Sequence, residues 1–431
     1  MKVTQPDAEG HWHRLDNTAN IFPVTTTKRF SNVYRIAVTL REEVDPELLQ
    51  RALEMVLPRF AYMRVQIRHG FFWHYLEDNP NMPQVREEEG YPCGYLDARE
   101  NRGFMFQVSY YKTRINLEVF HVVTDGTGGY RFLRALCCQY LMLAHPAAFT
   151  DEEKTRHWFA GHGTNTEDGY VANYTPTKKA TFRLGRGYKL KGQKYLAGPL
   201  SVIHAHLKTS AVLDLCHQKG VSVSQYITAC IAWAVYTRQL HSRPTKRPVN
   251  IMVPVNLRNL FPSNTSLNFF SSFYVSLLFE KPDFTFDDLL AEVKQQYAEK
   301  AKKEILQEKI SYTVGSGYSP LVRAIPLPIK ILMLRIIFAS SVKTSTMGTS
   351  NTGRIEFPEA FRPHITGTLS MLSTAQGEPF KCAITSYGEV MSLSFTSLLQ
   401  SVALQQSIIR KFSEDGLDVV VESNGVDYEN V

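Results

Sequence analysis

The sequence predicts an α/β protein built from two halves, each with its own strands and helices. The chain has 431 residues, which is more than a single hydrophobic core usually organises. Hydrophobic residues make up 44% of it and charged residues 21%, as in globular proteins. Strand and helix patterns occur on both sides of a stretch, residues 175–200, that has neither. We therefore expect an N-terminal half over residues 1–180, a basic crossover linker over 181–200 and a C-terminal half over 201–431.

The N-terminal half is expected to mix strands with helices. Residues 31–40 alternate apolar with polar side chains, which is the period of a strand. Asp45 and Pro46 then begin a helix, because aspartate caps a first turn and proline fits within it. The other elements predicted in this half are strands near 104–110 and 115–122 and a helix over about 130–143.

The C-terminal half begins again with a strand, residues 201–209, and a short helix that ends at Gly220. A second helix begins near Ser224. The sequence Tyr-Gly-Glu at 387–389 predicts the turn of a hairpin within residues 382–395. The other predicted elements are strands at 249–255, 269–279 and 365–372 and helices at 286–306 and 399–412.

Charge and cysteine content restrict the class of protein. The net charge of +7 suits an anionic ligand, and no nucleic-acid-binding motif accompanies it. The first ten residues lack the apolar core of a signal peptide. The six cysteines show no C-x-x-C spacing, which indicates reduced thiols and a cytoplasmic protein.

The basic crossover contains seven cations and no acid between residues 175 and 200. We interpret it as a solvated linker; the alternative is that it attracts a phosphate-bearing cofactor, because clustered positive charge concentrates anions. The cations are Lys178, Lys179, Arg183, Arg186, Lys189, Lys191 and Lys194.

A histidine ends an apolar run in the stretch EVFHVVTDGTGGYRFL, residues 118–133. On the predicted strand, Ile115, Leu117, Val119 and His121 share one face, which places His121 at the end of a buried stripe. The opposite face of the strand is expected to be exposed to solvent. A histidine in this position is either a hydrogen-bonded core residue or part of a cavity wall.

The residues that follow favour chemistry. Asp125, Gly126, Gly128 and Gly129 form a strand-to-helix loop, and glycine permits a close approach of ligand to backbone. Asp125 can accept a hydrogen bond nearby or anchor the loop through an arginine, and both would hold the imidazole of His121 as a general base requires. A phosphate-binding loop is not favoured, because the G-x-G-G spacing has no lysine.

The string H-V-V-T-D-G at 121–126 resembles the H-x-x-x-D-G signature of the CoA-dependent acyltransferase superfamily. That superfamily includes chloramphenicol acetyltransferase, the plant BAHD enzymes, alcohol acetyltransferases and the condensation domains of peptide synthetases. Two further segments are similar to it: I-M-V-P-V-N-L-R at 251–258 and S-N-T-G-R-I at 350–355. Phe120 stands where condensation domains usually carry a second histidine, and the plant D-F-G-W-G box is missing. The closest branch is that of alcohol acetyltransferases and free-standing relatives of condensation domains.

The resemblance implies two similar chloramphenicol acetyltransferase-like halves, each a mixed sheet with helices, around a central tunnel. It implies transfer of an acyl group from acyl-CoA to an alcohol or amine, with His121 as general base and no covalent intermediate. Acyl-CoA would be a co-substrate, without a metal or a permanently bound cofactor. The alternatives are a carrier-protein thioester as donor, which would make an acyl carrier protein a partner, and a non-catalytic relative that binds an acyl or carrier partner.

The resemblance also assigns residues. Asp125 would be structural and would pair with Arg258, and Gly126 would let the loop backbone approach the reacting centre. The residues expected to line the tunnel are Asn256, Asn351 and Gly353. The apolar stretch 319–341 contains three cations and two prolines and is not expected to span a bilayer. Its segment 328–338 is predicted to be a core or tunnel-wall helix, in preference to one that lies on lipid.

Overall fold

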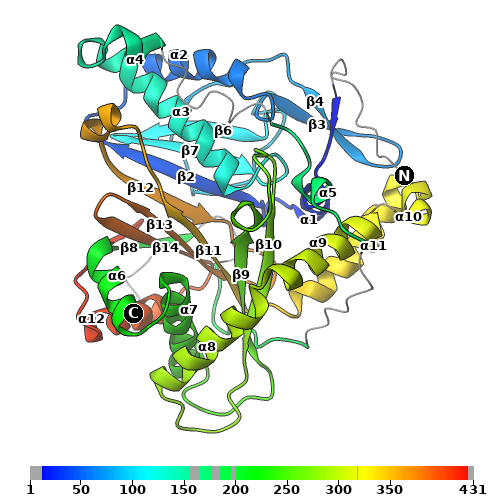
Figure 1. The fold of residues 1–431 in the computed structure, drawn as a ribbon, viewed down its shortest axis with the longest axis vertical. Coiled ribbons are helices and arrows are strands. Elements are labelled where there is room, and N and C mark those ends of the chain that lie inside the picture. Colours follow the sequence, from blue (N-terminus) through cyan, green and yellow to red (C-terminus); the bar gives the residue numbers. More distant parts are fainter. Residues whose placement is uncertain (1–11, 156–164, 177–184, 196–199, 318, 426–431) are drawn as a thin grey trace.

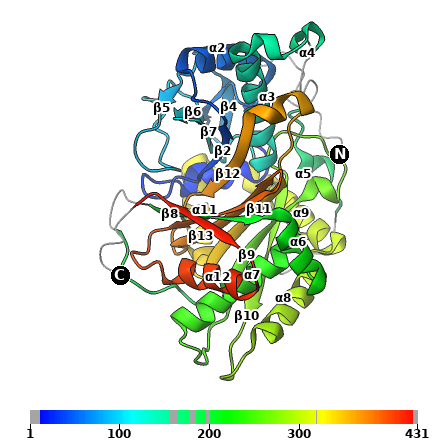
Figure 2. The same ribbon diagram turned by 90° about the vertical axis from the view of Figure 1, so that its left-hand side faces the viewer.

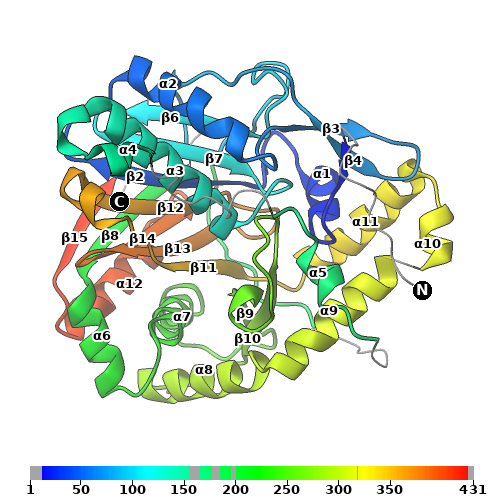
Figure 3. The same cartoon turned by 45° about the horizontal axis from the view of Figure 1, so that its top comes forward.

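Two mixed β-sheets lie at the centre of the molecule, with helices over their outer faces (Figure 1). The computed structural model describes residues 12–155, 165–176, 185–195, 200–317 and 319–425. In Figure 3 the sheets lie between α2 and α3 on one side and α7 and α12 on the other. This arrangement confirms the α/β architecture with two mixed sheets.

The first sheet has the strand order β12-β2-β7-β6-β5, and only the last pair, β6 and β5, is parallel. Its strands are β2 (Val33–Leu40), β5 (Arg86–Glu87), β6 (Phe106–Tyr111), β7 (Arg114–Phe120) and β12 (Ile365–Leu372). The helices α2 (Pro46–Val56) and α3 (Gly126–Ala144) pack against each other above it. Asp45 caps α2 as predicted, because its side chain accepts from the amides of Glu47 and Leu48.

The second sheet has the order β10-β9-β11-β13-β14-β8-β15, with β11 parallel to both of its neighbours. Its strands are β8 (Ser201–Lys208), β9 (Val249–Asn256), β10 (Phe270–Leu277), β11 (Met347–Arg354), β13 (Phe380–Tyr387), β14 (Val390–Ser397) and β15 (Val419–Ser423). The helices of this half are α6 (Thr209–Gln218), α7 (Val223–Ala234), α8 (Phe286–Lys300) and α12 (Ala403–Glu414). The predicted hairpin is present, with Tyr387 opposite Val390. The single helix predicted over 286–306 is two helices, α8 and α9 (Lys303–Gly317).

Strand β12 joins the two halves. It belongs to the C-terminal half by sequence, yet it pairs antiparallel with β2 from Ile365 opposite Leu40 to Leu372 opposite Tyr34. Figure 2 shows this strand, in orange, beside the blue strands of the first sheet. Backbone hydrogen bonds between β12 and β2 therefore connect the two halves. The boundaries predicted at residues 180 and 200 stay a prediction, since residues 177–184 and 196–199 lie outside the described chain.

The second face of β7 differs from the expectation. Asn116 and Glu118 were predicted to face water, but both side chains are buried. Glu118 accepts from Nε of Arg35 at 3.1 Å and from the amide of Cys93, because the segment that contains Cys93 covers this face. The prediction failed because Glu118 forms a buried ion pair with Arg35 and the side-chain amide of Asn116 donates to Glu88. Alternation of polarity does not reveal such pairing. All six cysteines are free and buried in the structure.

A small sheet and a group of helices complete the fold at one side of the molecule. The small sheet has the order β1-β4-β3. Beside it lie α1, α9, α10 and α11 (Figures 1 and 3). The bounds are β1 (Trp12–Arg14), β3 (Val65–His69), β4 (His74–Asp78), α1 (Phe22–Thr25), α10 (Pro320–Ala324) and α11 (Leu327–Val342), and the two remaining short helices are α4 (Asp151–Thr155) and α5 (Gly169–Ala172).

Candidate active site

His121 lies directly after β7, where its amide donates to the carbonyl of Asn32 at 3.0 Å. Its partly buried imidazole is enclosed by aromatic rings. Phe22 stacks on it at a centroid distance of 4.7 Å, and Tyr34 and Phe270 approach to 5.1 and 5.3 Å. Burial lowers the pKa of His121 below its ordinary value, and this outweighs the nearby charge of Asp125. The ring is therefore held neutral at physiological pH.

Asn268 fixes which nitrogen of His121 carries the proton. Its Nδ2 lies 3.0 Å from the carbonyl oxygen of His121 and 2.8 Å from Oδ2 of Asp16, and both of these oxygens accept. Its Oδ1, 2.9 Å from Nδ1 of His121, must then be an acceptor, so Nδ1 carries the hydrogen. The lone pair is left on Nε2, which is the nitrogen available as a base.

The buried carboxyl group of Asp16 holds Asn268 in turn. Oδ2 of Asp16 accepts from the amide and the side chain of Asn268, and its Oδ1 accepts from the amides of Thr18 and Ala19 at 3.0 and 2.8 Å. Burial, followed by the charge of Asp168, raises the pKa of Asp16 to about 8. The segment before α1 thus orients the imidazole through Asn268.

The carboxylate of Asp125 turns away from His121 and performs two structural tasks. Its Oδ1 accepts from the amides of Thr127 and Gly128 at 3.0 and 3.3 Å and so caps α3. Its Oδ2 accepts from Arg258 at 2.7 Å and from the amide of Phe269 at 2.9 Å. The structure therefore contains the expected ion pair with Arg258, and both side chains are buried.

Arg258 extends this connection into the C-terminal half. Its guanidinium donates to the carbonyls of Thr265 and Leu267 at 3.0 and 2.5 Å. Those two residues lie in the segment directly before Asn268. The ion pair consequently fixes the start of α3 and the partner of His121 with one set of contacts.

The glycines after Asp125 serve close packing between the halves. A Cβ on Gly128 would overlap Thr124 and the carbonyl of Ser266, and one on Gly129 would overlap the hydroxyl of Tyr34. A Cβ on Gly126 would lie 3.5 Å from Cγ2 of Thr352, which places the start of α3 against β11. The overlaps explain Gly128 and Gly129 without a phosphate ligand, whereas the 3.5 Å contact at Gly126 leaves room for a Cβ.

The predicted tunnel-lining residues lie around the start of α3 and in β11. Asn256 donates to Oγ1 of Thr127 at 3.2 Å, so it contacts the first turn of α3. Asn351 and Gly353 lie in an exposed irregular stretch of β11, where the amide of Gly353 donates to Asn351 at 2.8 Å. Neither makes a described hydrogen bond to His121, and their role in substrate binding stays a prediction.

Sequence reasoning missed the residues that orient the imidazole. Asn268 and Asp16 are far from His121 along the chain, and neither belongs to a motif that the sequence displayed. Phe22 was not singled out, and Tyr34 lies in the predicted strand 31–40 without a further role. Their sole signal was weak: Asn268 interrupts an apolar stretch at the start of a predicted strand.

A cavity of about 1010 Å³ lies beside this network, between the small sheet and α9, α10 and α11. Leu15, Asn17 and Asn20 line its inner wall, next to Asp16 in the chain. Most of its lining is apolar. Helix α11, predicted as a core or tunnel-wall helix, supplies Met333 and Ile337 to the wall but leaves its other side exposed. The predicted central tunnel itself stays a prediction.

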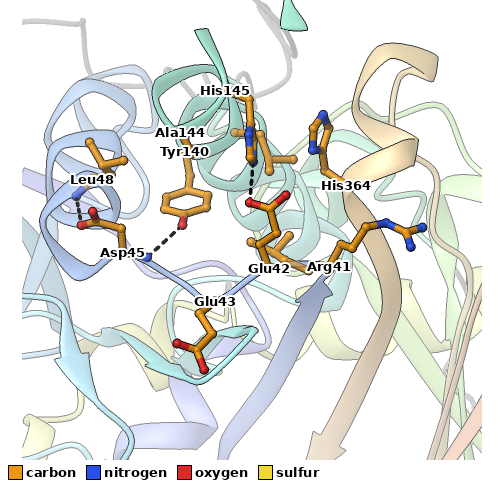
Figure 4. A pocket seen from close by; sticks show the side chains of 11 residues that line it. Arg41, Glu42, Glu43, Asp45, Leu48, Tyr140, Ala144, His145 and His364 are labelled. Carbon is orange, nitrogen blue, oxygen red and sulfur yellow. Dashed lines mark hydrogen bonds and ion pairs between the residues drawn. The ribbon is translucent and has the colours of Figure 1, made fainter. Parts of the chain in front are cut away.

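A second, smaller hollow of about 200 Å³ lies at the far end of α3 (Figure 4). Its His145 approaches Glu42 at 3.7 Å and stacks on His364 at 4.4 Å, while Tyr140 accepts from the amide of Asp45. These contacts give His145, His364 and Tyr140 partners within the protein. The hollow is therefore explained as a packing site between α2, α3 and the segment before β12. In the described part of the chain, no group of three or more potential metal ligands was found. No described helix is long and apolar enough to cross a bilayer.

Comparison with solved structures places this geometry in a known fold. The TRI3 trichothecene 15-O-acetyltransferase from Fusarium sporotrichioides aligns over 96% of both chains with a TM-score of 0.60 and 11% identity. A mutant of the starter condensation domain of rhizomide synthetase RzmA, in complex with C8-CoA, aligns over 95% of this chain and 98% of that one, with a TM-score of 0.58 and 12% identity. The chain has the CoA-dependent acyltransferase fold.

Polyketide synthase associated protein 5 from Mycobacterium tuberculosis has the same acyltransferase fold and aligns over 93% of this chain and 96% of its own, with a TM-score of 0.56 and 14% identity. A scan against protein-family models and a search of curated proteins found no match. At these identities the likeness establishes the acyltransferase fold, and the roles of individual residues rest on the geometry above.

Proposed function

We propose that the protein transfers an acyl group from acyl-CoA to an alcohol or amine, with His121 as the general base. The observation that carries this proposal is the orientation of the imidazole. Asn268 accepts from Nδ1 and leaves the lone pair on Nε2, within a partly buried aromatic enclosure. A neutral, oriented imidazole is what proton abstraction from a hydroxyl or amine requires.

The reaction proceeds in two steps without a covalent enzyme intermediate. Nε2 removes the proton from the acceptor as its oxygen or nitrogen attacks the thioester carbonyl. The tetrahedral intermediate then collapses, the carbon–sulfur bond breaks, and the imidazolium returns the proton to the CoA thiolate. Base catalysis of this kind contributes about 10²–10⁴-fold in rate.

The surroundings of His121 support both steps. Oδ1 of Asn268 stabilises the imidazolium, because it accepts from Nδ1 in either protonation state. The rings of Phe22 and Phe270 exclude water from the imidazole, which limits hydrolysis of the thioester. Asp125 acts through position only, since its two oxygens are occupied by the helix start, Arg258 and Phe269.

The comparisons support a transferase and leave two donors open. One structural neighbour is named an acetyltransferase, and another is a condensation domain in complex with C8-CoA. A carrier-protein thioester is the second candidate donor, because condensation domains recur among the neighbours. Acyl-CoA is preferred here because Phe120 stands in place of the second histidine usual in condensation domains.

The test is a matrix of acyl-CoA chain lengths against alcohol and amine pools, with release of free thiol as the readout. The background from the protein should be low, because all six cysteines are buried. We expect thiol release that requires both the acyl-CoA and an acceptor. Release from an acyl carrier protein thioester alone would favour the second donor, and no release from either would contradict the proposal.

A further inference from the structure

Helices α10 and α11 carry a large exposed apolar surface, joined by the tip of the β3–β4 hairpin. We call this surface the docking face. Its residues are Leu321 (81% exposed), Phe71 (73%), Ile336 (63%), Leu332 (60%) and Ile329 (52%). So many exposed large aliphatic and aromatic side chains on adjoining elements are unusual on a soluble surface, and such patches mark interaction sites.

The composition of α11 is that of a helix covered by other apolar groups. The helix is apolar around its whole circumference, which is typical of a helix covered on all sides. In the structure little of it is covered: Leu327 and Lys330 are buried, whereas Met333 and Ile337, which line the open cavity, are 45% and 60% exposed. On the outer side, Leu332 and Ile336 are 60% and 63% exposed.

The segment that contains α10 and α11 is rich in cations. No acidic residue occurs between Glu308 and Glu356. The cations of this interval are Lys309, Arg323, Lys330, Arg335, Lys343 and Arg354. Two copies of such a face would repel each other, whereas an anionic lipid surface would attract both its cations and its apolar side chains.

The face is held firmly in place. The amide of Leu327 donates to the carbonyl of Phe71 at 2.9 Å, which ties α11 to the hairpin. The buried Lys330 donates to the carbonyl of Phe72 at 3.1 Å and lies 3.6 Å from the ring centroid of Trp73. The apolar side chains are therefore presented on a fixed scaffold.

We propose that the docking face binds the surface of an anionic lipid bilayer, with α10 and α11 lying in the interface. The helices do not cross the membrane, consistent with the absence of a spanning helix among the described residues. Val322, Met333 and Ile337 from the same two helices line the cavity of about 1010 Å³. Docking would place this apolar cavity against the bilayer, so that a long aliphatic substrate could reach it without crossing water; this last step rests on the proposed acyltransferase function.

Vesicle flotation tests the proposal with the full chain. The probes are vesicles of phosphatidylcholine with and without phosphatidylglycerol. We expect binding to the anionic vesicles, and a partition coefficient lowered about tenfold or more in the triple variant Leu321→Gln, Leu332→Gln and Ile336→Gln. These three residues do not line the cavity. The matched control is Met55→Gln with Leu213→Gln, two residues of similar type that are 45% and 40% exposed on α2 and α6.

The cations give a second, independent arm. Arg335→Gln and Lys343→Gln should each weaken binding to anionic vesicles about fivefold at low salt, and the loss should fade at high salt. Turnover of a soluble short-chain acyl-CoA should stay unchanged in every variant, which separates this proposal from the catalytic one. Absence of flotation, equal flotation of the triple variant, or a dimer that the triple variant dissociates would each overturn it.

Discussion

Removal of the Asp125 charge should destabilise the protein through Arg258. In Asp125→Asn the amide oxygen can still cap α3, but an NH2 group then faces two donors, the guanidinium of Arg258 and the amide of Phe269. The guanidinium is left buried without its anion. Breaking such a pair from one side costs about 3–5 kcal/mol, whereas the retained cap alone is worth about 1 kcal/mol. We therefore expect a loss of about 3–5 kcal/mol in the free energy of unfolding.

The double-mutant cycle separates the pair from its surroundings. Arg258→Gln should cost a similar amount, and the double variant should lose less than the sum of the singles, with a coupling of about 0.5–3 kcal/mol. Urea unfolding is followed by tryptophan fluorescence and by circular dichroism, and coincident curves establish that one transition is measured. The matched control is the pair Arg68–Glu77, which has the same 2.7 Å distance but side chains 51% and 36% exposed. Its coupling should be about 0–1 kcal/mol. Additive losses at Asp125 and Arg258, or a coupling no larger than the control's, would refute the argument.

Three further predictions concern orientation, charge and pH. Asn268→Ala should lower kcat and lower the acid-limb pKa of kcat/KM further, because Oδ1 of Asn268 stabilises the imidazolium. Burial already holds the pKa of His121 below its ordinary value in the parent, and an unmoved limb would contradict the positioning role. Replacing the exposed Lys191 and Lys194 with glutamine should raise the KM for acyl-CoA and leave kcat unchanged, and the rise in KM should fade at high salt. An unchanged KM at low salt would return these lysines to the interpretation as a solvated linker. The folded state retains the proton of Asp16 between its ordinary pKa of 3.8 and about 8, so the free energy of unfolding should fall as pH rises through that window. Asp16→Asn should reduce that slope, and an equal slope in urea titrations at several pH values would contradict it.

The lysine prediction excludes Lys189 for a structural reason. The sequence grouped it with the other cations of the basic crossover, but its ammonium donates to the carbonyls of Val342, Ser345 and Gly377. Its replacement would strand three acceptors and change stability as well as charge. Lys178, Lys179 and Arg183 lie outside the described residues.

Local patterns predicted most of the fold. The caps, apolar stripes and hairpin turn placed elements such as α2, β12 and the β13–β14 hairpin, because these depend on neighbours in the chain. The pairing of β12 with β2 was not predictable in this way, since it joins residues more than three hundred positions apart. The buried face of β7 was missed for a related reason: Arg35 and Glu118 neutralise each other across two strands.

In the candidate site, too, residues in local motifs were predicted and residues from distant segments were not. His121 and the Asp125–Arg258 pair followed from motifs, and the structure brings that pair together. Asn268 and Asp16 orient the imidazole through contacts between distant segments, which no single-sequence pattern displayed. The exposure of α11 was also missed, because an apolar helix is normally covered and its sequence does not say by what.

Single-turnover thiol release by His121→Ala, compared with the parent at saturating acyl-CoA and acceptor, tests the central claim most directly. The variant should keep the parent's circular dichroism spectrum. Its free energy of unfolding should stay within about 1 kcal/mol of the parent's, because His121 is only partly buried. Its rate should fall about 10²–10⁴-fold, the contribution of a general base. A folded His121→Ala protein that turns over within a few-fold of the parent would contradict the account.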